Sequence, residues 1–328
     1  MSQYSIRSVV MAGLIGAGVL GSTSTLAELQ VTPRIIGGTA VTDVAAEYDA
    51  IPWQVALFYQ ADEPDTFGFF CGGSIIADRW ILTAAHCAKF AGNNYVVAGT
   101  NNWRDWSNAQ VKAVTRWHIH PGYDTTVGAQ FDNDIALLEL AEPIDLVTCD
   151  TRCEVVGIVS SDNEGAVIPD GTEVLISGWG TTDPNDDTSN PDILQFASIN
   201  MVDCATAPVD TDGDITSNMI CAAAADYSRD TCLGDSGGPL VAESNDGSGD
   251  MLLAGVTSFG YGCATAGYPG VYTRVANYTS WIAAVQDGTC CDEDPAPSRS
   301  SKSGGGALQW WLLLGLAGLG LRRKIWQR

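Results

Sequence analysis

The central part of the chain predicts an all-β fold in which antiparallel strands form a barrel or a sandwich. Short apolar segments alternate with turn-forming residues, and neither an internal repeat nor a long run with helical spacing occurs. With 328 residues, 45% of them hydrophobic, the chain can bury a core, which excludes a wholly disordered protein. The expected strands lie at 54–59, 73–76, 81–84, 95–98, 135–140, 173–177, 194–199, 251–259 and 270–274.

One helix is expected near the end of this region, from Tyr278 to Gln286. Trp281, Ile282 and Val285 follow one another at helical spacing, and Gly288 stands just beyond them. The next residues, 287–303, are rich in Pro, Ser, Asp and Gly and show no apolar periodicity. We therefore expect a flexible linker there.

The first residues predict an export signal. Arg7 precedes an apolar run from Val9 to Leu20, and Thr25 and Ala27 supply the small residues of a cleavage site. A run of about a dozen apolar residues is too short to span a bilayer. We expect residues 1–27 to be a signal peptide, and the alternative is an N-terminal membrane anchor.

The last residues, 304–328, predict a tail that enters a membrane. A glycine triplet at 304–306 leads into an apolar run at 307–321, which a basic cluster at 322–324 closes. This order resembles the GlyGly-CTERM sorting tail of Gram-negative bacteria, which a rhomboid-type membrane protease removes during surface delivery. The resemblance implies a transmembrane helix, transient membrane association and a tail-processing protease. A permanent anchor is the alternative.

The region between the two ends is strongly acidic. The whole chain has a formal charge of −23, and residues 35–290 hold eight Lys and Arg against 35 Asp and Glu, a net charge of −27. This acidity argues against nucleic-acid binding, because Lys and Arg make most phosphate contacts and no basic cluster occurs before residue 322. Neutral or cationic partners are favoured instead.

The ten cysteines are typical of an exported protein with disulfides, although spacing alone does not pair them. A zinc site is disfavoured because the cysteines are scattered and the chain has only three histidines. We expect neither a metal nor a cofactor.

Three short runs together predict nucleophilic catalysis. They are Leu-Thr-Ala-Ala-His-Cys at 82–87, Phe-Asp-Asn-Asp-Ile-Ala-Leu-Leu at 131–138 and Gly-Asp-Ser-Gly-Gly-Pro at 234–239. Each is weak alone, because a single His is more often structural, and Asp or Ser is common in turns. Together they supply a base, an acid that orients the base, and a serine in a glycine-rich turn. The N–H groups of Gly234 and Ser236 would then stabilise an oxyanion.

In their residues and in their order along the chain, these runs resemble those of the trypsin-like, chymotrypsin-fold serine peptidases. The resemblance covers residues 35 to about 286. The resemblance implies two six-stranded antiparallel β-barrels with a C-terminal helix, and an acyl-enzyme mechanism. It makes His86 the base, Asp134 the orienting acid and Ser236 the nucleophile. Asp132 is the less favoured orienting acid.

The run Pro-Arg-Ile-Ile-Gly-Gly at 33–38 resembles the family's activation site. Cleavage after Arg34 would free the amine of Ile35. In the family this new ammonium inserts beside the aspartate that precedes the catalytic serine, and Asp235 stands at that position here. The chain is thus expected to be a zymogen with a propeptide at 28–34, which an activating protease or the enzyme itself cuts. The alternative is that Arg34 is an ordinary exposed residue.

Asp230 stands where the family carries the carboxylate at the floor of the primary pocket. Ser258, Gly260 and Gly270 match the pocket walls, and the glycines would leave room for a long side chain. The expected substrates are proteins or peptides with Arg or Lys at the cleaved bond. The alternative for Asp230 is a solvated loop residue.

The resemblance also implies disulfides Cys71–Cys87, Cys204–Cys221 and Cys232–Cys263. Four cysteines remain. Cys149 and Cys153 could pair locally, and Cys290 and Cys291 could pair either with those two or with each other; the sequence does not decide between these pairings. Calcium is not expected at 100–103, which lacks acids. It is not expected in a loop that starts at 210–214 either, because that loop lacks the glycine at the sixth position and the glutamate at the twelfth position of an EF-hand loop.

The chain is therefore expected to be a secreted or surface-delivered serine endopeptidase with a peptidase domain at 35–286. The competing interpretations are a binding module or adhesin on the same fold, and an esterase that uses the same triad. The complete set of catalytic, pocket and activation residues disfavours the first. The acidic pocket floor disfavours the second.

Overall fold

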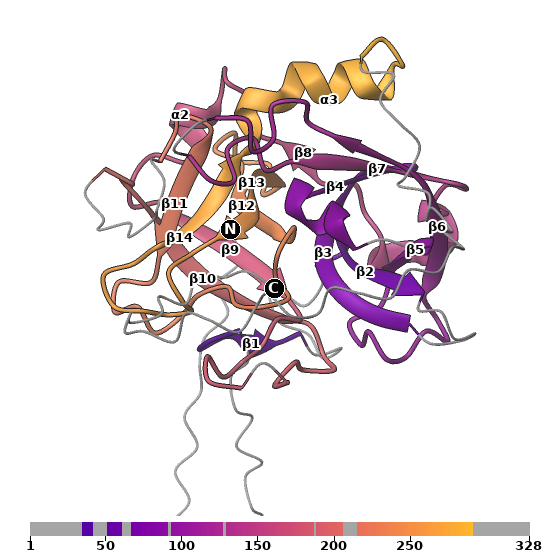
Figure 1. The fold of residues 1–328 in the computed structure, drawn as a ribbon, viewed down its shortest axis with the longest axis horizontal. Helices are drawn as coiled ribbons and strands as arrows, with labels where there is room; N and C mark the ends of the chain where they lie inside the picture. Colours follow the sequence, from indigo (N-terminus) through magenta and orange to yellow (C-terminus); the bar gives the residue numbers. More distant parts are fainter. Residues whose placement is uncertain are drawn as a thin grey trace, which may run out of the picture. The chain divides into compact units, whose positions relative to one another are not determined.

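The described part of the chain contains two six-stranded antiparallel β-barrels and a C-terminal helix, as the sequence resemblance implies (Figure 1). The computed structural model describes residues 35–41, 51–60, 67–90, 93–126, 129–186, 188–205 and 215–290. All statements about the structure below refer to these residues.

The first barrel closes in the order β2-β3-β4-β7-β6-β5. Its interior is filled by fully buried aliphatic and aromatic side chains, among them Phe58, Leu82 and Leu137. The strands are β2 (Gln54–Gln60), β3 (Phe67–Ala77), β4 (Trp80–Thr83), β5 (Asn93–Ala98), β6 (Gln110–Ile119) and β7 (Ala136–Leu140).

The second barrel follows the order β9-β10-β11-β14-β13-β12 and closes because β9 pairs with both β10 and β12. Two short strands extend it, β1 (Thr39–Ala40) beside β10 and β8 (Gly157–Ile158) beside β13. The barrel strands are β9 (Glu173–Gly178), β10 (Gln195–Val202), β11 (Met219–Ala223), β12 (Pro239–Glu243), β13 (Met251–Phe259) and β14 (Gly270–Arg274).

Strand β6 was not predicted from the sequence, and its side chains explain why. Val111 and Ile119 point outward and are 41% and 40% exposed, while Lys112 and Arg116 occupy less exposed positions. The usual alternation of buried apolar and exposed polar residues is therefore inverted along much of this strand. Strands β11 and β12 were missed as well.

The predicted C-terminal helix is present as α3 (Thr279–Gln286), which buries Ile282 and Val285. Tyr278, the expected first residue, instead ends the 3-10 helix η3 (Val275–Tyr278). The other helices are single turns: η1 (Ala85–Lys89), α1 (Leu146–Cys149), η2 (Asp150–Arg152) and α2 (Glu164–Val167).

Hydrogen bonds join the two barrels close to the three sequence runs. The Ser177 hydroxyl donates to Gln54 Oε1 at 2.7 Å, and the N–H of Gly72 donates to the carbonyl of Ser236 at 2.8 Å. The Thr273 hydroxyl donates to the carbonyl of Asp134 at 2.7 Å. The candidate catalytic residues therefore lie where the barrels meet.

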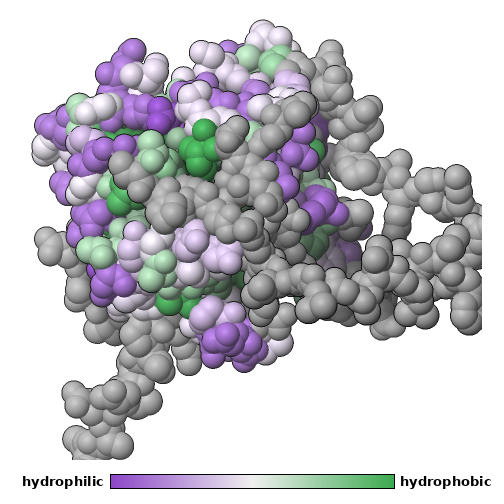
Figure 2. Space-filling view, turned by 60° about the vertical axis from the view of Figure 1, so that its left-hand side comes forward, coloured by the Kyte–Doolittle hydropathy of each residue, from purple (hydrophilic) through white to green (hydrophobic). Residues whose placement is uncertain are grey.

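The surface of the described region is mainly hydrophilic on the face shown in Figure 2, where apolar side chains form small separate areas. None of the helices in this region is long and apolar enough to cross a bilayer. The expected signal peptide, propeptide, glycine triplet and apolar tail lie outside the described residues.

Candidate active site

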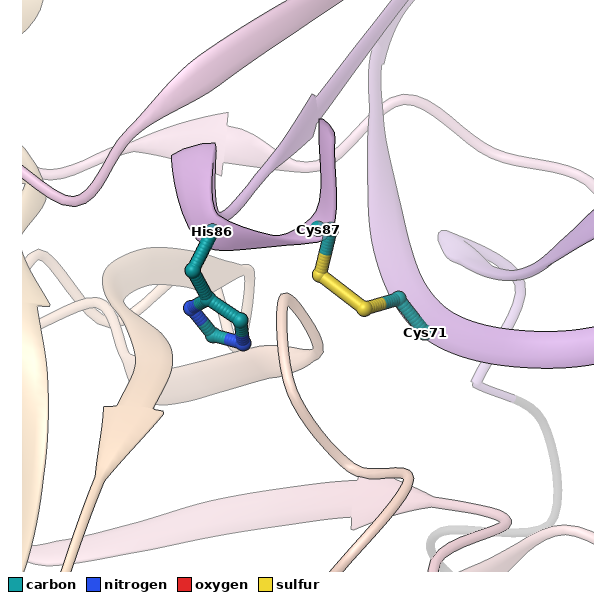
Figure 3. A group of neighbouring side chains, drawn as sticks. All are labelled: Cys71, His86 and Cys87. Carbon is teal, nitrogen blue, oxygen red and sulfur yellow. A yellow bond between two sulfur atoms is a disulfide. The ribbon is translucent and has the colours of Figure 1, made fainter. Parts of the chain in front are cut away.

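The imidazole of His86 is held by the carboxylate of Asp134. His86 lies on η1, directly after β4, and Figure 3 shows it beside the disulfide that joins Cys87 on the same turn to Cys71 on β3. Its Nδ1 is 2.7 Å from Asp134 Oδ2, and its backbone N–H donates to Asp134 Oδ1 at 2.8 Å. With its proton on Nδ1, the ring leaves Nε2 free to accept a proton.

Asp134 is fully buried, and its remaining contacts come from the second barrel. The Ser258 hydroxyl donates to Oδ2 at 2.5 Å, and Thr273 binds the Asp134 carbonyl. A buried carboxylate requires such donors because it has lost its hydration. The contacts fix the direction from which Asp134 meets the imidazole.

The neighbouring Asp132 has different partners. Its carboxylate accepts from the hydroxyls of Thr126 and Thr216 at 2.5 and 2.7 Å, and from the Asn218 amide at 3.0 Å. These hydrogen bonds oppose the effect of burial and leave the pKa of Asp132 below its ordinary value. The structure therefore pairs His86 with Asp134, and Asp132 ties this loop to the second barrel.

Ser236 lies in the tight turn between Asp235 and β12, against the segment that leads into η1. Gly237 has a positive φ of 77°, and a Cβ there would stand 2.1 Å from Thr83 Oγ1 and 2.6 Å from the Gly72 carbonyl. Only glycine fits so close to the first barrel. Within the described residues the Ser236 hydroxyl has no hydrogen-bond partner, and such bonds are often long in sites without substrate.

The same turn leaves two backbone N–H groups free. Gly234 has a φ of 101°, and neither its N–H nor that of Ser236 donates to another of the described residues. Unpaired N–H groups in one turn are suited to binding an oxyanion. A Cβ at Gly234 would meet Asn190 Nδ2 and the Cα of Gly180, both at 3.1 Å, so this backbone is closely packed.

Asp235 is a buried carboxylate with no cationic partner among the described residues. It is 1% exposed, and it accepts backbone N–H bonds from Gly180 at 2.7 Å and Cys232 at 2.8 Å. Burial raises the pKa of Asp235 to about 7, although the two backbone hydrogen bonds act to lower it. Ile35, which the sequence assigns to activation, is also fully buried, and Arg34 lies outside the described residues.

Asp230 is buried where the sequence places the pocket floor. It is 7% exposed, its Oδ2 accepts from the Ala264 N–H at 2.9 Å, and burial raises its pKa to about 7. A Cβ at Gly270 would lie 3.0 Å from Asp230 Oδ1, so Gly270 leaves the carboxylate uncovered. A Cβ at Gly260 would have only ordinary contacts, with the Gly262 carbonyl at 3.5 Å.

The two raised pKa values predict that the full-length protein loses stability as the pH rises. Each carboxyl group has an ordinary value of 3.8 and a folded value of about 7, so the folded state binds more protons between these limits. The stabilisation that comes from protonation of these two groups is complete below pH 4 and is lost as the pH rises through 7. For each group the free energy of unfolding falls by at most about 1.4 kcal/mol per pH unit. Urea unfolding of the full-length Ser236→Ala variant at pH 5 and pH 8 measures this.

Asp235→Asn is the control for that experiment. It removes one of the two ionisations, and the variant should therefore lose less unfolding free energy between pH 5 and pH 8 than the Ser236→Ala parent. A Ser236→Ala protein that becomes more stable over this interval, or an equal pH dependence in both proteins, would contradict the prediction.

Four disulfides join described cysteines: Cys71–Cys87, Cys149–Cys153, Cys204–Cys221 and Cys232–Cys263. Three of these are the pairs that the resemblance implies, and the Cys149–Cys153 pair decides between the alternatives left open for those two residues. Cys290 is also disulfide-bonded, while Cys291 lies outside the described residues. Cys71, His86 and Cys87 lie close together, but the disulfide removes both thiolates as metal ligands.

Two features of the site were not foreseen. Ser258, expected as a pocket wall, donates its hydroxyl to Asp134. Phe131 lies edge-on to the His86 ring at 5.8 Å and stacks on Phe259 at 5.4 Å. The sequence holds no signal for either, because the partners are far apart along the chain.

Comparisons with known proteins give a consistent result. The family described as Trypsin matches residues 36–282. The chain is 36% identical to Trypsin 5G1 of Aedes aegypti over 260 residues, and the aligned region covers 78% of this chain and 86% of that protein. It is 38% identical over 242 residues to Trypsin Blo t 3 of Blomia tropicalis, with 73% and 82% covered. It is 34% identical over 278 residues to Serine protease 1 of Rattus norvegicus, with 84% and 97% covered.

Proposed function

Because the chain belongs to the trypsin family of serine endopeptidases, we propose that it is made as a zymogen and, once activated, cleaves peptide bonds after Arg or Lys. The observation that carries the proposal is the His86–Asp134 hydrogen bond beside the turn that holds Ser236. This hydrogen bond holds the proton of the imidazole on Nδ1. The N–H groups of Gly234 and Ser236, in the adjacent turn, donate to no other described residue.

In the proposed mechanism Ser236 is the nucleophile and His86 the general base. His86 Nε2 takes the hydroxyl proton as the Ser236 oxygen attacks the substrate carbonyl, and Asp134 stabilises the resulting imidazolium. The N–H groups of Gly234 and Ser236 bind the oxyanion. His86 then gives its proton to the leaving amine, and water hydrolyses the acyl-enzyme. No cofactor is needed.

Asp230 is proposed to select the cationic side chain. A guanidinium or ammonium that enters beside Gly270 would meet a carboxylate whose hydrogen-bond partners among the described residues are the Ala264 N–H and Thr231. Pairing supplies the charge compensation that the buried carboxylate lacks. The strong negative charge of residues 35–290 also attracts cationic peptides.

Activation is proposed to proceed by cleavage after Arg34. The new ammonium of Ile35 would then pair with Asp235, which is buried and has no cationic partner among the described residues. Such a pair relieves the cost of the buried carboxylate, and it would hold the Gly234–Ser236 turn in its active form. The activating protease is either an already active copy, since Arg34 fits the proposed specificity, or another trypsin-like enzyme.

The Arg34→Gln variant tests this step. Treatment with immobilised trypsin should give the wild-type chain a new N-terminus at Ile35 and strong activity towards Arg peptides. The Arg34→Gln chain should stay at the precursor level, because the Ile35 amine is never freed. Arg104→Gln, which removes another basic residue, should be activated like the wild type. An Arg34→Gln chain that reaches wild-type activity without a new N-terminus at Ile35 would exclude the zymogen.

The two ends are proposed to direct delivery to the outside of a Gram-negative cell. Residues 1–27 would be removed at export, residues 28–34 form the propeptide, and the tail at 304–328 sorts the protein through a membrane and is cut by a membrane protease. The disulfides of the peptidase domain at 35–286 favour an oxidising compartment.

A further inference from the structure

The chain crosses from the first barrel to the second through a surface loop that carries Arg152. The loop lies between β7 and β8 and contains two single helical turns, α1 and η2. Arg152 ends η2 and is exposed, and Val147 on α1 is 87% exposed, so the loop projects from the surface. Exposed loops are the segments at which proteases most often cut a folded chain.

A cut after Arg152 would divide the candidate catalytic residues between two polypeptides. His86 and Asp134 lie before this bond, and Ser236 lies after it. The peptide chain would then no longer join the two barrels, which also contact each other through hydrogen bonds such as that from the Gly72 N–H to the Ser236 carbonyl. For an enzyme that cleaves after Arg, this bond is therefore a vulnerable position in its own chain.

The Cys149–Cys153 disulfide spans the vulnerable bond. It is alone in this among the four disulfides whose cysteines are both described, because the other three lie wholly on one side of the bond. Those three are Cys71–Cys87 before it, and Cys204–Cys221 and Cys232–Cys263 after it. If the bond were cut, the Cys149–Cys153 disulfide would keep the two barrels covalently joined.

The same disulfide holds the segment around Arg152 in a closed ring. The Cα atoms of Cys149 and Cys153 are 5.4 Å apart. A segment of five residues in an extended strand spans about 13 Å between its first and last Cα atoms, because a strand rises about 3.3 Å per residue. Peptides that bind along a protein edge do so in this extended form. The disulfide therefore prevents residues 149–153 from adopting the conformation that an active-site cleft binds.

The ring is also packed against the first barrel at Gly99. A Cβ at Gly99 would lie 2.6 Å from Cys149 Sγ and 3.0 Å from Cys153 Sγ, and both cysteines are buried. Arg152 Nη1 donates to the carbonyl of Gly99 at 3.0 Å and to that of Asn108 at 2.5 Å. The guanidinium would have to leave both carbonyls before it could enter the proposed specificity pocket.

The other seven basic residues of 35–290 are constrained without such a ring. They are Arg79, Lys89, Arg104, Lys112, Arg116, Arg229 and Arg274. Three lie in paired strands, where cleavage requires a barrel to open. The Arg79 carbonyl accepts from the Leu140 N–H, and Lys89 ends the helical turn η1. Arg104 and Arg229 are each followed directly by an aspartate, which a domain with a net charge of −27 repels.

We propose that the Cys149–Cys153 disulfide protects the enzyme against its own activity by closing the loop around Arg152. This inference rests on the proposed specificity for Arg and Lys. Without the disulfide, the Ser236 oxygen of another copy attacks the Arg152 carbonyl, and the C–N bond to residue 153 breaks. The nitrogen of residue 153 leaves as an amine with the proton from His86. Water then hydrolyses the ester, which yields the Arg152 carboxylate and restores Ser236.

The test uses full-length Ser236→Ala chains as substrates for a small amount of activated wild-type enzyme. One substrate keeps the disulfide, and the other carries Cys149→Ser with Cys153→Ser. Mass spectrometry of reduced samples should show cleavage after Arg152 at least about 100-fold faster in the second substrate. Equal rates of cleavage after Arg152 in the two substrates would overturn the proposal.

Two matched variants separate opening of this loop from general unfolding. Arg152→Gln, added to the Cys149→Ser and Cys153→Ser substrate, should abolish the new cut. Cys204→Ser with Cys221→Ser removes a disulfide whose ring, residues 205–220, contains no Lys or Arg, and it should cause no cut after Arg152. A cut after Arg152 in this second variant would overturn the proposal. Cuts after several of the eight basic residues in the first substrate would do the same, because they would show that the whole fold had opened.

The lifetime of the active enzyme gives a second readout. With Ser236 in place, Cys149→Ser with Cys153→Ser should make activity decay faster as the enzyme concentration rises, because one copy cuts another. Adding Arg152→Gln should restore the lifetime of the wild type, and a variant that decays equally fast with Arg152→Gln would contradict the protective role.

A chromogenic Arg peptide in each mixture reports the underlying specificity. If the peptide is cleaved and the opened loop is not, the protective role of the disulfide is wrong. If neither is cleaved, the proposed Arg specificity fails, and trypsin in place of the enzyme then tests the loop by itself. Trypsin should cut the Cys149→Ser and Cys153→Ser substrate after Arg152 and spare this bond in the substrate that keeps the disulfide, and equal cutting of both would overturn the protection.

Discussion

Asp134→Asn should lower kcat by about 10⁴-fold while the protein folds normally. The carboxylate accepts from His86 Nδ1 at 2.7 Å and from the Ser258 hydroxyl at 2.5 Å. An amide in its place can present N–H to the ring, so that the proton moves to Nε2. The imidazole then cannot take the hydroxyl proton of Ser236. Steady-state kinetics on an Arg peptide after activation measures the loss.

Asp132→Asn is the matched control, because it makes the same chemical change two residues earlier. Asp132 binds Thr126, Thr216 and Asn218 rather than the imidazole. Its replacement should cost about 1–3 kcal/mol of unfolding free energy and leave kcat within about tenfold of the wild type. Equal losses of kcat in both variants, or a larger loss in Asp132→Asn, would reverse the assignment of the orienting acid.

Asp230→Asn should lower kcat/KM for Arg peptides by about 10²–10⁴-fold. Removing one partner of a buried ion pair costs roughly 3–5 kcal/mol, and each 1.4 kcal/mol is about tenfold. Peptides that end in Ala do not use the carboxylate, so their turnover should change little. Asp226→Asn, which alters an exposed acid just before this segment, should leave the preference for Arg unchanged.

The same carboxyl group predicts a pH dependence of specificity. Burial raises the pKa of Asp230 to about 7, so the group loses its charge as the pH falls through 7. The ratio of kcat/KM for Arg peptides to that for Ala peptides should therefore fall below pH 7, because kcat/KM reports on the free enzyme. A ratio that stays constant from pH 5 to pH 8, or that survives in Asp230→Asn, would contradict the role of Asp230.

The local parts of the site could be predicted from the sequence, because each run is contiguous and its chemistry is specific. His86, Asp134 and the turn of Ser236 were selected as candidates in this way, and the structure brings His86 and Asp134 into contact. The sequence contains no equivalent signal for Ser258 or Thr273, which reach Asp134 from more than 120 residues away. Such contacts depend on how the second barrel closes against the first.

Some strands of the fold were predicted accurately, and others were missed. Strands with buried apolar runs, such as β7 and β13, were placed to within one residue. Strand β6 was missed because its apolar side chains face outward at Val111 and Ile119. The Cys149–Cys153 pair could not be derived from spacing, since four cysteines allow three pairings.

The central claim is that cleavage after Arg34 produces a serine endopeptidase specific for Arg and Lys. It is tested most directly by hydrolysis of matched chromogenic peptides ending in Arg, Lys, Phe or Ala, before and after limited treatment with trypsin that is then removed. Wild type and Ser236→Ala should be compared. Turnover of the Arg and Lys peptides should begin only when Ile35 is the new N-terminus, and it should be absent in Ser236→Ala. No turnover in wild type with Ile35 exposed, or equal turnover in Ser236→Ala, would contradict the account.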